Sequence, residues 1–253
     1  MIKIFFKKKS FFKFLVCAFL CGLLMVSMHI SSIEEYTAET AFLAGRDGYV
    51  DLADKEFSSE PITCSLWFVL FVPFISQIML NDSEIAKNFV FIRLKDNGKW
   101  YDYKMCQGLV YSLFASTIYN VSIFLWVLIR GFEIQSSKTA VLYVAWGSVS
   151  GALFLFLLVV LAFVLSIKLP SHISTIIVLF FLVFTMIGML FIYNDNILQY
   201  FLLTNYFISW HLVVSDNNAM YTHPTWCYYM ALVMMIGIIY LIGRKAMKKS
   251  DSI

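Results

Sequence analysis

The chain has 253 residues, of which 60% are hydrophobic, 18% aromatic and only 14% charged, and its formal net charge is +3 at pH 7. Soluble globular domains carry about a quarter charged residues, so this composition excludes a soluble domain. The small net charge gives no indication of nucleic-acid binding, and the odd count of 5 cysteines implies no disulfide framework. The apolar residues form long continuous runs rather than alternating strands, which predicts an all-α integral membrane protein.

The first thirty residues combine a basic start with an apolar run. Residues 1–13 mix lysines with phenylalanines and isoleucines, as in an amphipathic helix that lies in an anionic membrane interface. A secretory signal peptide has a similar layout. We find no small-x-small cleavage site near Ser27–Ser32, so we expect a retained helix. The apolar runs predict six transmembrane helices, at about 14–30, 62–80, 105–129, 139–167, 172–193 and 224–242.

The segments between these spans differ sharply in charge. Residues 31–61 hold eight acidic residues against Arg46 and Lys55, which suits an outer loop. Residues 195–223 contain an apolar stretch long enough to cross, yet they carry no Lys or Arg. With six spans, the basic groups at residues 3–13, 87–104, 168 and 244–249 fall on the cytoplasmic side, together with both termini, as the positive-inside rule prefers. We therefore expect 195–223 to be an outer interfacial or re-entrant segment.

The predicted spans contain no Asp, Glu, Lys or Arg. A charge at a helix centre costs about 2.5–3.5 kcal/mol on insertion scales, so it is retained only for a task such as ion coupling. The chain also lacks a GxxxxGK[ST] phosphate loop. We expect no enzyme activity and no cofactor in this chain, and any energy for transport must come from another subunit.

The loop at 81–104 is basic and patterned. Ile85, Phe89 and Ile92 follow helical spacing, as in a short amphipathic helix at the inner surface. Asp96–Gly98 is a turn signal, and the aromatic and basic residues of Lys99–Lys104 suit the membrane boundary. Basic inner loops also occur in most polytopic proteins merely as topology anchors.

This layout resembles that of the permease subunits of ABC-2 type transporters. The matching residues are Glu84, Arg93, residues 96–99, Trp100 and Lys104. The resemblance implies that the 81–104 loop docks on a separate ATPase subunit, which binds ATP and Mg, and that two permease copies pair as a homo- or heterodimer. The ATPase contact is expected at Glu84, Asn88, Arg93, Lys95, Lys99, Trp100 and Lys104.

The resulting hypothesis is the permease subunit of an ATP-driven exporter in a bacterial cell membrane, surrounded by lipid. Its cargo, or the agent it protects against, would be an amphipathic or antimicrobial peptide. The alternative is a non-transporting membrane immunity or sensor protein that uses its acidic outer loop. A polytopic membrane enzyme is a third class, but the spans hold no acid–base pair or metal cluster.

Two smaller features complete the sequence reading. Gly147 and Gly151 form a small-xxx-small pattern that predicts a helix-packing face, which would meet either this chain or a second copy. Ser150 is not central in a GxSxG motif, so a hydrolase elbow is not indicated. Cys64 and Cys227 both lie near the outer boundary, and they would pair only if the second and sixth spans touch there.

Overall fold

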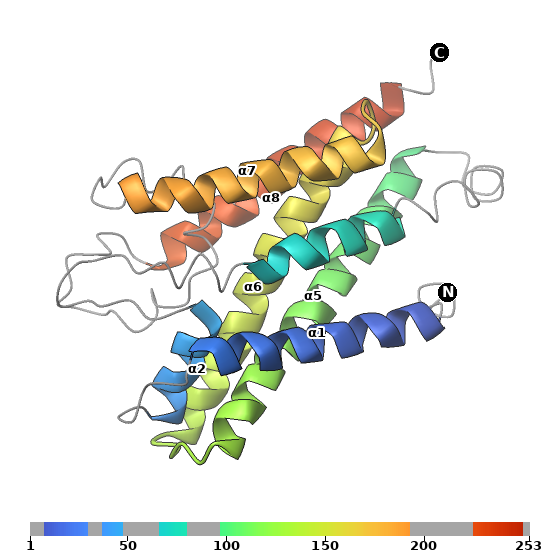
Figure 1. Cartoon of the computed structure of the whole chain (residues 1–253). Helices are drawn as coiled ribbons and strands as arrows, with labels where there is room; N and C mark the ends of the chain where they lie inside the picture. The colour runs from blue at the N-terminus through green and yellow to red at the C-terminus, as the bar shows by residue number, and fades with distance from the viewer. Residues whose placement is uncertain (1–7, 30–36, 48–65, 80–96, 193–224, 250–253) are drawn as a thin grey trace.

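The structure is a computed structural model that describes residues 8–29, 37–47, 66–79, 97–192 and 225–249 (Figure 1). Within these ranges all regular secondary structure is helical, which confirms the predicted all-α class. The helices are α1 (Lys8–His29), α2 (Ala38–Asp47), an unlabelled helix at Leu66–Met79, α5 (Asn97–Ile129), α6 (Ser137–Leu165), α7 (Ser171–Ile192) and α8 (Thr225–Lys249).

Three of the described helices are long and apolar enough to cross a membrane. They cover Gly98–Ile129, Ser137–Leu165 and Tyr229–Lys248. Shorter apolar helices occur at Phe12–Ser27, Leu66–Met79 and Ser171–Thr185, each of which overlaps a predicted span. The membrane class is therefore supported by length and composition, while the total of six spans stays a prediction.

The antiparallel pair of α5 and α6 is the centre of the molecule (Figure 1). The turn between them uses Gly131, whose φ of +84° is a conformation that favours glycine at a helix C-terminus. Ser136 then caps α6, because its side chain accepts a hydrogen bond from the Thr139 amide. A tight hairpin thus brings two long apolar helices together along most of their length.

Among the three described helices long enough to cross a membrane, α6 is the most enclosed. It is apolar on all its faces, the pattern of a helix surrounded by others. It packs against α5, α7 and α8, and α1 packs across α5. The Leu66–Met79 helix joins this core through aromatic rings: Phe68 contacts Phe154 of α6, and Trp67 stacks on Tyr119 of α5.

The outer faces of the peripheral helices are apolar as well. Phe180 and Phe184 on α7 are 72% and 65% exposed, and Leu241 on α8 is 63% exposed. Exposed side chains of this size on several helices are costly in water but ordinary against lipid. Their placement agrees with a membrane-embedded body.

Three helices extend into segments that the sequence analysis predicted to be interfacial segments or loops. Helix α1 starts at Lys8, so the second half of the predicted interfacial segment 1–13 is continuous with the first apolar run. Helix α2 lies inside the predicted outer loop 31–61. Helix α5 starts at Asn97, so the last part of the predicted 81–104 loop is helical. The 195–223 segment and Cys64 lie outside the described residues.

Candidate functional site

Two clusters of polar side chains connect distant segments of the chain. The first surrounds Arg46 and joins α2 to α5 and α6; we call it the Arg46 cluster. The second surrounds Asp102 and joins the start of α5 to the end of α8; we call it the Asp102 cluster. The members of the Arg46 cluster are Arg46, Ser116, Asn120, Gly147, Ser150 and Gly151, and those of the Asp102 cluster are Asp102, Tyr240 and Arg244.

Helix α2 brings Arg46 to its site. Thr37 begins the helix with reciprocal hydrogen bonds to Thr40, a pattern typical of a helix N-terminus. One face of α2 then buries apolar side chains completely, among them Phe42 and Leu43. Phe42 meets Phe124 of α5 edge to face, with 6.1 Å between ring centroids. This apolar face presses α2 onto the α5–α6 pair, so a residue on the same face must enter the core.

Arg46 enters the core and is only 3% exposed. Its Nη2 atom donates to the Gly147 carbonyl oxygen and to Ser150 Oγ, both at 3.1 Å. Gly147 lies ten residues after the first residue of α6, which is about 15 Å along the helix axis. A guanidinium at this depth is expensive to desolvate, so hydrogen bonds to a carbonyl and a hydroxyl are needed to hold it there.

The small residues of α6 make room for Arg46. A Cβ atom at Gly147 would lie 3.0 Å from Arg46 Nε and 3.1 Å from Asn120 Oδ1. A Cβ atom at Gly151 would lie 2.6 Å from Ser116 Oγ. The Gly147–Gly151 face therefore meets α2 and α5 of the same chain, and its space is taken up by polar side chains rather than by a second backbone.

Asn120 completes the Arg46 cluster from α5. Its Nδ2 atom donates to the Ser116 carbonyl oxygen at 2.7 Å and to Ser116 Oγ at 3.3 Å. This orients Oδ1 towards Gly147, where it is buried and accepts no hydrogen bond in the described part of the chain. A carbonyl oxygen beside a guanidinium lowers the local positive potential and so favours the buried Arg46.

Glu39 anchors the other end of α2. Its two carboxylate oxygens accept hydrogen bonds from the amides of Ser136 at 2.8 Å and Gln135 at 3.3 Å, directly before α6. Burial alone would raise the pKa of Glu39, but these backbone N–H groups hold that pKa below its ordinary value of 4.5. The carboxylate also faces the positive end of the α6 dipole. Glu39 and Arg46 thus fix α2 to α6 at two points.

The Asp102 cluster is built differently. Asp102 Oδ2 lies 2.9 Å from Arg244 Nη2, and Oδ1 accepts a hydrogen bond from the Tyr240 hydroxyl. The side chains of Asp102 and Arg244 are 36% and 40% exposed. Beside them Tyr101 is fully buried against Phe163, and a Cβ atom at Gly243 would lie 2.3 Å from Tyr101 Oη. The start of α5 and the end of α8 therefore approach closely.

The predicted ATPase-contact residues divide into three groups. Lys99 is exposed, whereas Trp100 and Lys104 are 3% and 1% exposed inside the chain. Lys104 Nζ donates to Gln107 Oε1 at 3.1 Å and lies 5.9 Å from the centroid of the Trp100 ring. Of these three residues, only Lys99 is accessible to a partner protein in the described chain. Glu84, Asn88, Arg93 and Lys95 lie outside the described residues, and their role stays a prediction.

Arg46, Glu39, Asn120 and Asp102 were not among the site residues predicted from the sequence. The signals were weak but present. Arg46 stands in an acidic segment on an amphipathic helix pattern, and the polar residues of α5 and α6 recur at helical spacing on otherwise apolar helices. Within the described ranges, no group of three or more His, Cys, Asp or Glu residues is placed to hold a metal ion.

Comparison with known proteins adds nothing to these observations. No protein-family model, no curated protein and no solved structure matches the chain.

Proposed function

We propose that this chain is the membrane-spanning permease subunit of an ATP-driven exporter of the ABC-2 type. It would span the membrane six times with both termini in the cytoplasm, and it would work as a pair of permeases with separate ATPase subunits. Its cargo, or the agent it protects against, would be an amphipathic or antimicrobial peptide. The proposal starts from the resemblance of the basic 81–104 loop and is supported by the way that loop continues into the helix bundle.

The observation that carries the proposal is the continuity of α5. This helix starts at Asn97, within the segment expected to contact the ATPase, and runs unbroken to Ile129. Its first turns contact α8 through Asp102 and Tyr101, and Ser116 and Asn120 further along it belong to the Arg46 cluster. A displacement applied at the 81–104 segment would therefore reach α8 and the far end of α6 through one stiff element.

The distribution of basic residues supports the expected orientation. In Figure 1 the start of α5, the α6–α7 turn and the end of α8 lie towards the upper right, while α2 and the α5–α6 turn lie at the lower left. The first group carries Lys99, Lys168 and the basic residues of α8, which include Arg244. Under the positive-inside rule that end would face the cytoplasm, where an ATPase is available.

The test is to isolate the full chain from its native membrane and to identify what comes with it. We expect an ATPase subunit with a phosphate-loop motif. Combined charge reversal, Lys99→Glu with Arg93→Glu, should lower its recovery at least about ten-fold, because like charges opposed across an interface cost several kcal/mol. Lys168→Glu is the matched control, since Lys168 is exposed in the α6–α7 turn.

Lys104 is unsuitable for this test because it is buried against Gln107, so its reversal would disturb folding as well as docking. Recovery of the chain without any nucleotide-hydrolysing subunit would contradict the proposal. So would an undiminished complex in the charge-reversed variant.

A non-transporting immunity or sensor protein is the second candidate, and one observation favours it. Part of the acidic segment, α2, is inserted against the bundle through Glu39 and Arg46, so a ligand bound to that segment would act on α5 and α6 directly. Deleting residues 82–95 leaves α5 intact and separates the two functions. A sensor or immunity protein would keep its protective effect in a peptide-survival assay, and a permease would lose it.

A further inference from the structure

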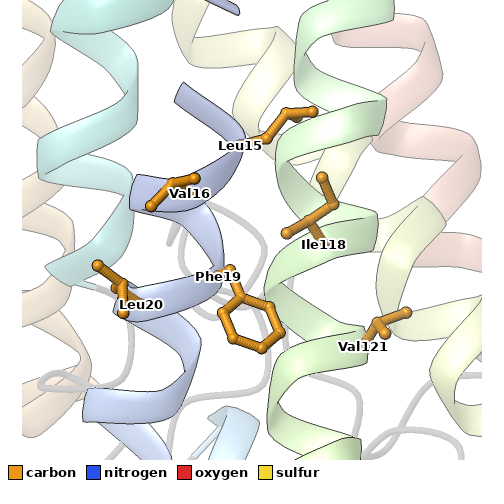
Figure 2. Close-up of a pocket in the computed structure, with 6 residues that line it drawn as sticks. All are labelled: Leu15, Val16, Phe19, Leu20, Ile118 and Val121. Atoms are coloured by element: carbon orange, nitrogen blue, oxygen red, sulfur yellow. The ribbon is translucent and has the colours of Figure 1, made fainter. Parts of the chain in front are cut away.

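An open apolar groove runs between α1 and α5. It has a volume of about 380 Å³, at the low end of the range for small-ligand pockets. Figure 2 shows Phe19 lying between the two ribbons, with Val16 and Leu20 on the α1 side. The lining residues are Leu15, Val16, Phe19 and Leu20 of α1 and Ile118 and Val121 of α5. No polar side chain takes part in this lining.

The groove follows from how the two helices approach. At Gly22 of α1 a Cβ atom would lie 2.7 Å from the Tyr119 carbonyl oxygen, so the backbones are in near contact there. Phe14, one helix face away, packs against Tyr111 of α5 and Phe74 of the Leu66–Met79 helix. Between these two contacts the larger lining side chains hold the outer surfaces of α1 and α5 apart, which leaves the groove open to the side.

A basic residue lies at one end of this groove. Lys13 is exposed, and it shares a helix face with Val16 and Leu20 because residues at i, i+3 and i+7 align along a helix. Side chains on a helix lean towards its N-terminus, so the Lys13 ammonium points away from the groove towards the membrane boundary. Lys8 and Lys9 begin the same helix in the sequence. The apolar lining of the groove suits an acyl chain, and the cationic residue at its end suits an anionic headgroup.

We propose that this groove binds one acyl chain of an anionic phospholipid, with the phosphate beside Lys13. A second copy of the chain is a poorer occupant. Two copies related by a two-fold axis along the membrane normal would bring both lysine-rich α1 starts together at the same membrane boundary, where they would repel each other. A lipid phosphate neutralises the same charges. The proposal requires only a membrane location and no ATPase, so it stands or fails separately from the exporter function.

The test uses the purified full chain in mild detergent, with phosphatidylglycerol and phosphatidylcholine as separate probes and retained lipid measured by native mass spectrometry. We expect phosphatidylglycerol to remain bound. Val16→Trp should fill the groove and reduce retention about ten-fold, the factor expected when roughly two methylene groups lose their burial. Leu24→Trp is the matched control, because Leu24 is 64% exposed on the same helix and does not line the groove.

Two further variants separate the alternatives. Val121→Phe fills the groove from the α5 wall and should give the same loss, so the result does not depend on one variant folding. Lys13→Gln should lower phosphatidylglycerol retention several-fold and leave phosphatidylcholine unchanged. Equal retention of both lipids, unaffected by Lys13→Gln, would overturn the proposal. Absence of bound lipid together with a Val16→Trp shift from dimer to monomer would also overturn it and assign the groove to a second copy.

Discussion

The Arg46 cluster and the Asp102 cluster both use a charged side chain to join segments far apart in the sequence, but water reaches them very differently. Arg46 is 3% exposed and is held by a carbonyl and a hydroxyl of α6. Asp102 and Arg244 are 36% and 40% exposed and face each other as an ordinary ion pair. At one end of the bundle a charged side chain is enclosed by its neighbours. At the other end water can replace the hydrogen bonds of a half-exposed ion pair.

This difference indicates which of the two sets of contacts is easier to break. Breaking a contact of a buried charge leaves polar groups without solvent, so the fold resists it strongly. Breaking a half-exposed ion pair costs little, because water takes over the hydrogen bonds. We infer that the polar contacts of α2 with α6 around Arg46 are the harder to break, and that the ion pair at Asp102 is the weaker of the links between the start of α5 and the end of α8, beside the ring contact of Tyr101 with Tyr240. Three variants test this contrast, from the largest expected effect to the smallest.

Arg46→Ala should have the largest effect. It removes both charge-assisted hydrogen bonds to α6 and leaves the Gly147 carbonyl and Ser150 hydroxyl buried, so we expect a loss of about 2–3 kcal/mol in the free energy of docking α2. Amide hydrogen exchange across Ala38–Asp47 measures this directly. Arg46→Lys, which keeps the charge but loses the planar fork, should recover part of the protection. Unchanged exchange in Arg46→Ala would show that the apolar face alone holds α2.

Glu39→Gln should have an intermediate effect of about 1 kcal/mol, the typical contribution of a carboxylate at a helix N-terminus. Because its pKa is lower in the folded chain, the Glu39 carboxylate stabilises α2 docking at and above the ordinary pKa of 4.5. That contribution is lost as the pH falls through the lower, folded-state pKa. Relative to the intrinsic exchange rate at each pH, protection of the α2 amides should therefore fall in acid in the parent chain and be nearly pH-independent in Glu39→Gln. Equal acid sensitivity in both would contradict this.

Arg244→Gln should have the smallest effect, below about 1 kcal/mol, because the pair with Asp102 is more than a third exposed. Salt should reduce it further, since screening weakens exposed pairs. The measurement is the thermal midpoint of the detergent-solubilised protein at low and high salt. A loss as large as that of Arg46→Ala would remove the contrast between the two clusters, and would make the Asp102 end equally fixed.

The helical class and the positions of the apolar helices could be read from the sequence because both depend on local composition. The start of α5 could not. Asn97 and Gly98 indicate a turn locally, but they already belong to the first turn of the helix, because Trp100 and Tyr101 are buried and both contact Phe163 of α6. Packing with a partner far along the chain decided this boundary, and no local pattern records it.

The Arg46 cluster was missed for a similar reason. An arginine in an acidic segment suggests a solvated loop, and the absence of charges from the predicted spans suggested a bundle without buried ions. Arg46 enters the bundle from outside those spans, and its hydrogen-bond partner Gly147 is 101 residues away in the sequence. The glycine pattern of α6 was recognised as a packing face, but sequence alone could not say that a side chain rather than a helix fills it.

The length of α5 has one more consequence. Its 33 residues extend about 50 Å, whereas a hydrocarbon core is about 30 Å thick. In a bilayer, the excess would be taken up by a tilt of the helix, or the end that carries Lys99 and Asp102 would extend as a rigid segment beyond the lipid. The thickness of the bilayer would then set how far this segment extends from the lipid, and a thicker bilayer would leave less of it exposed to water.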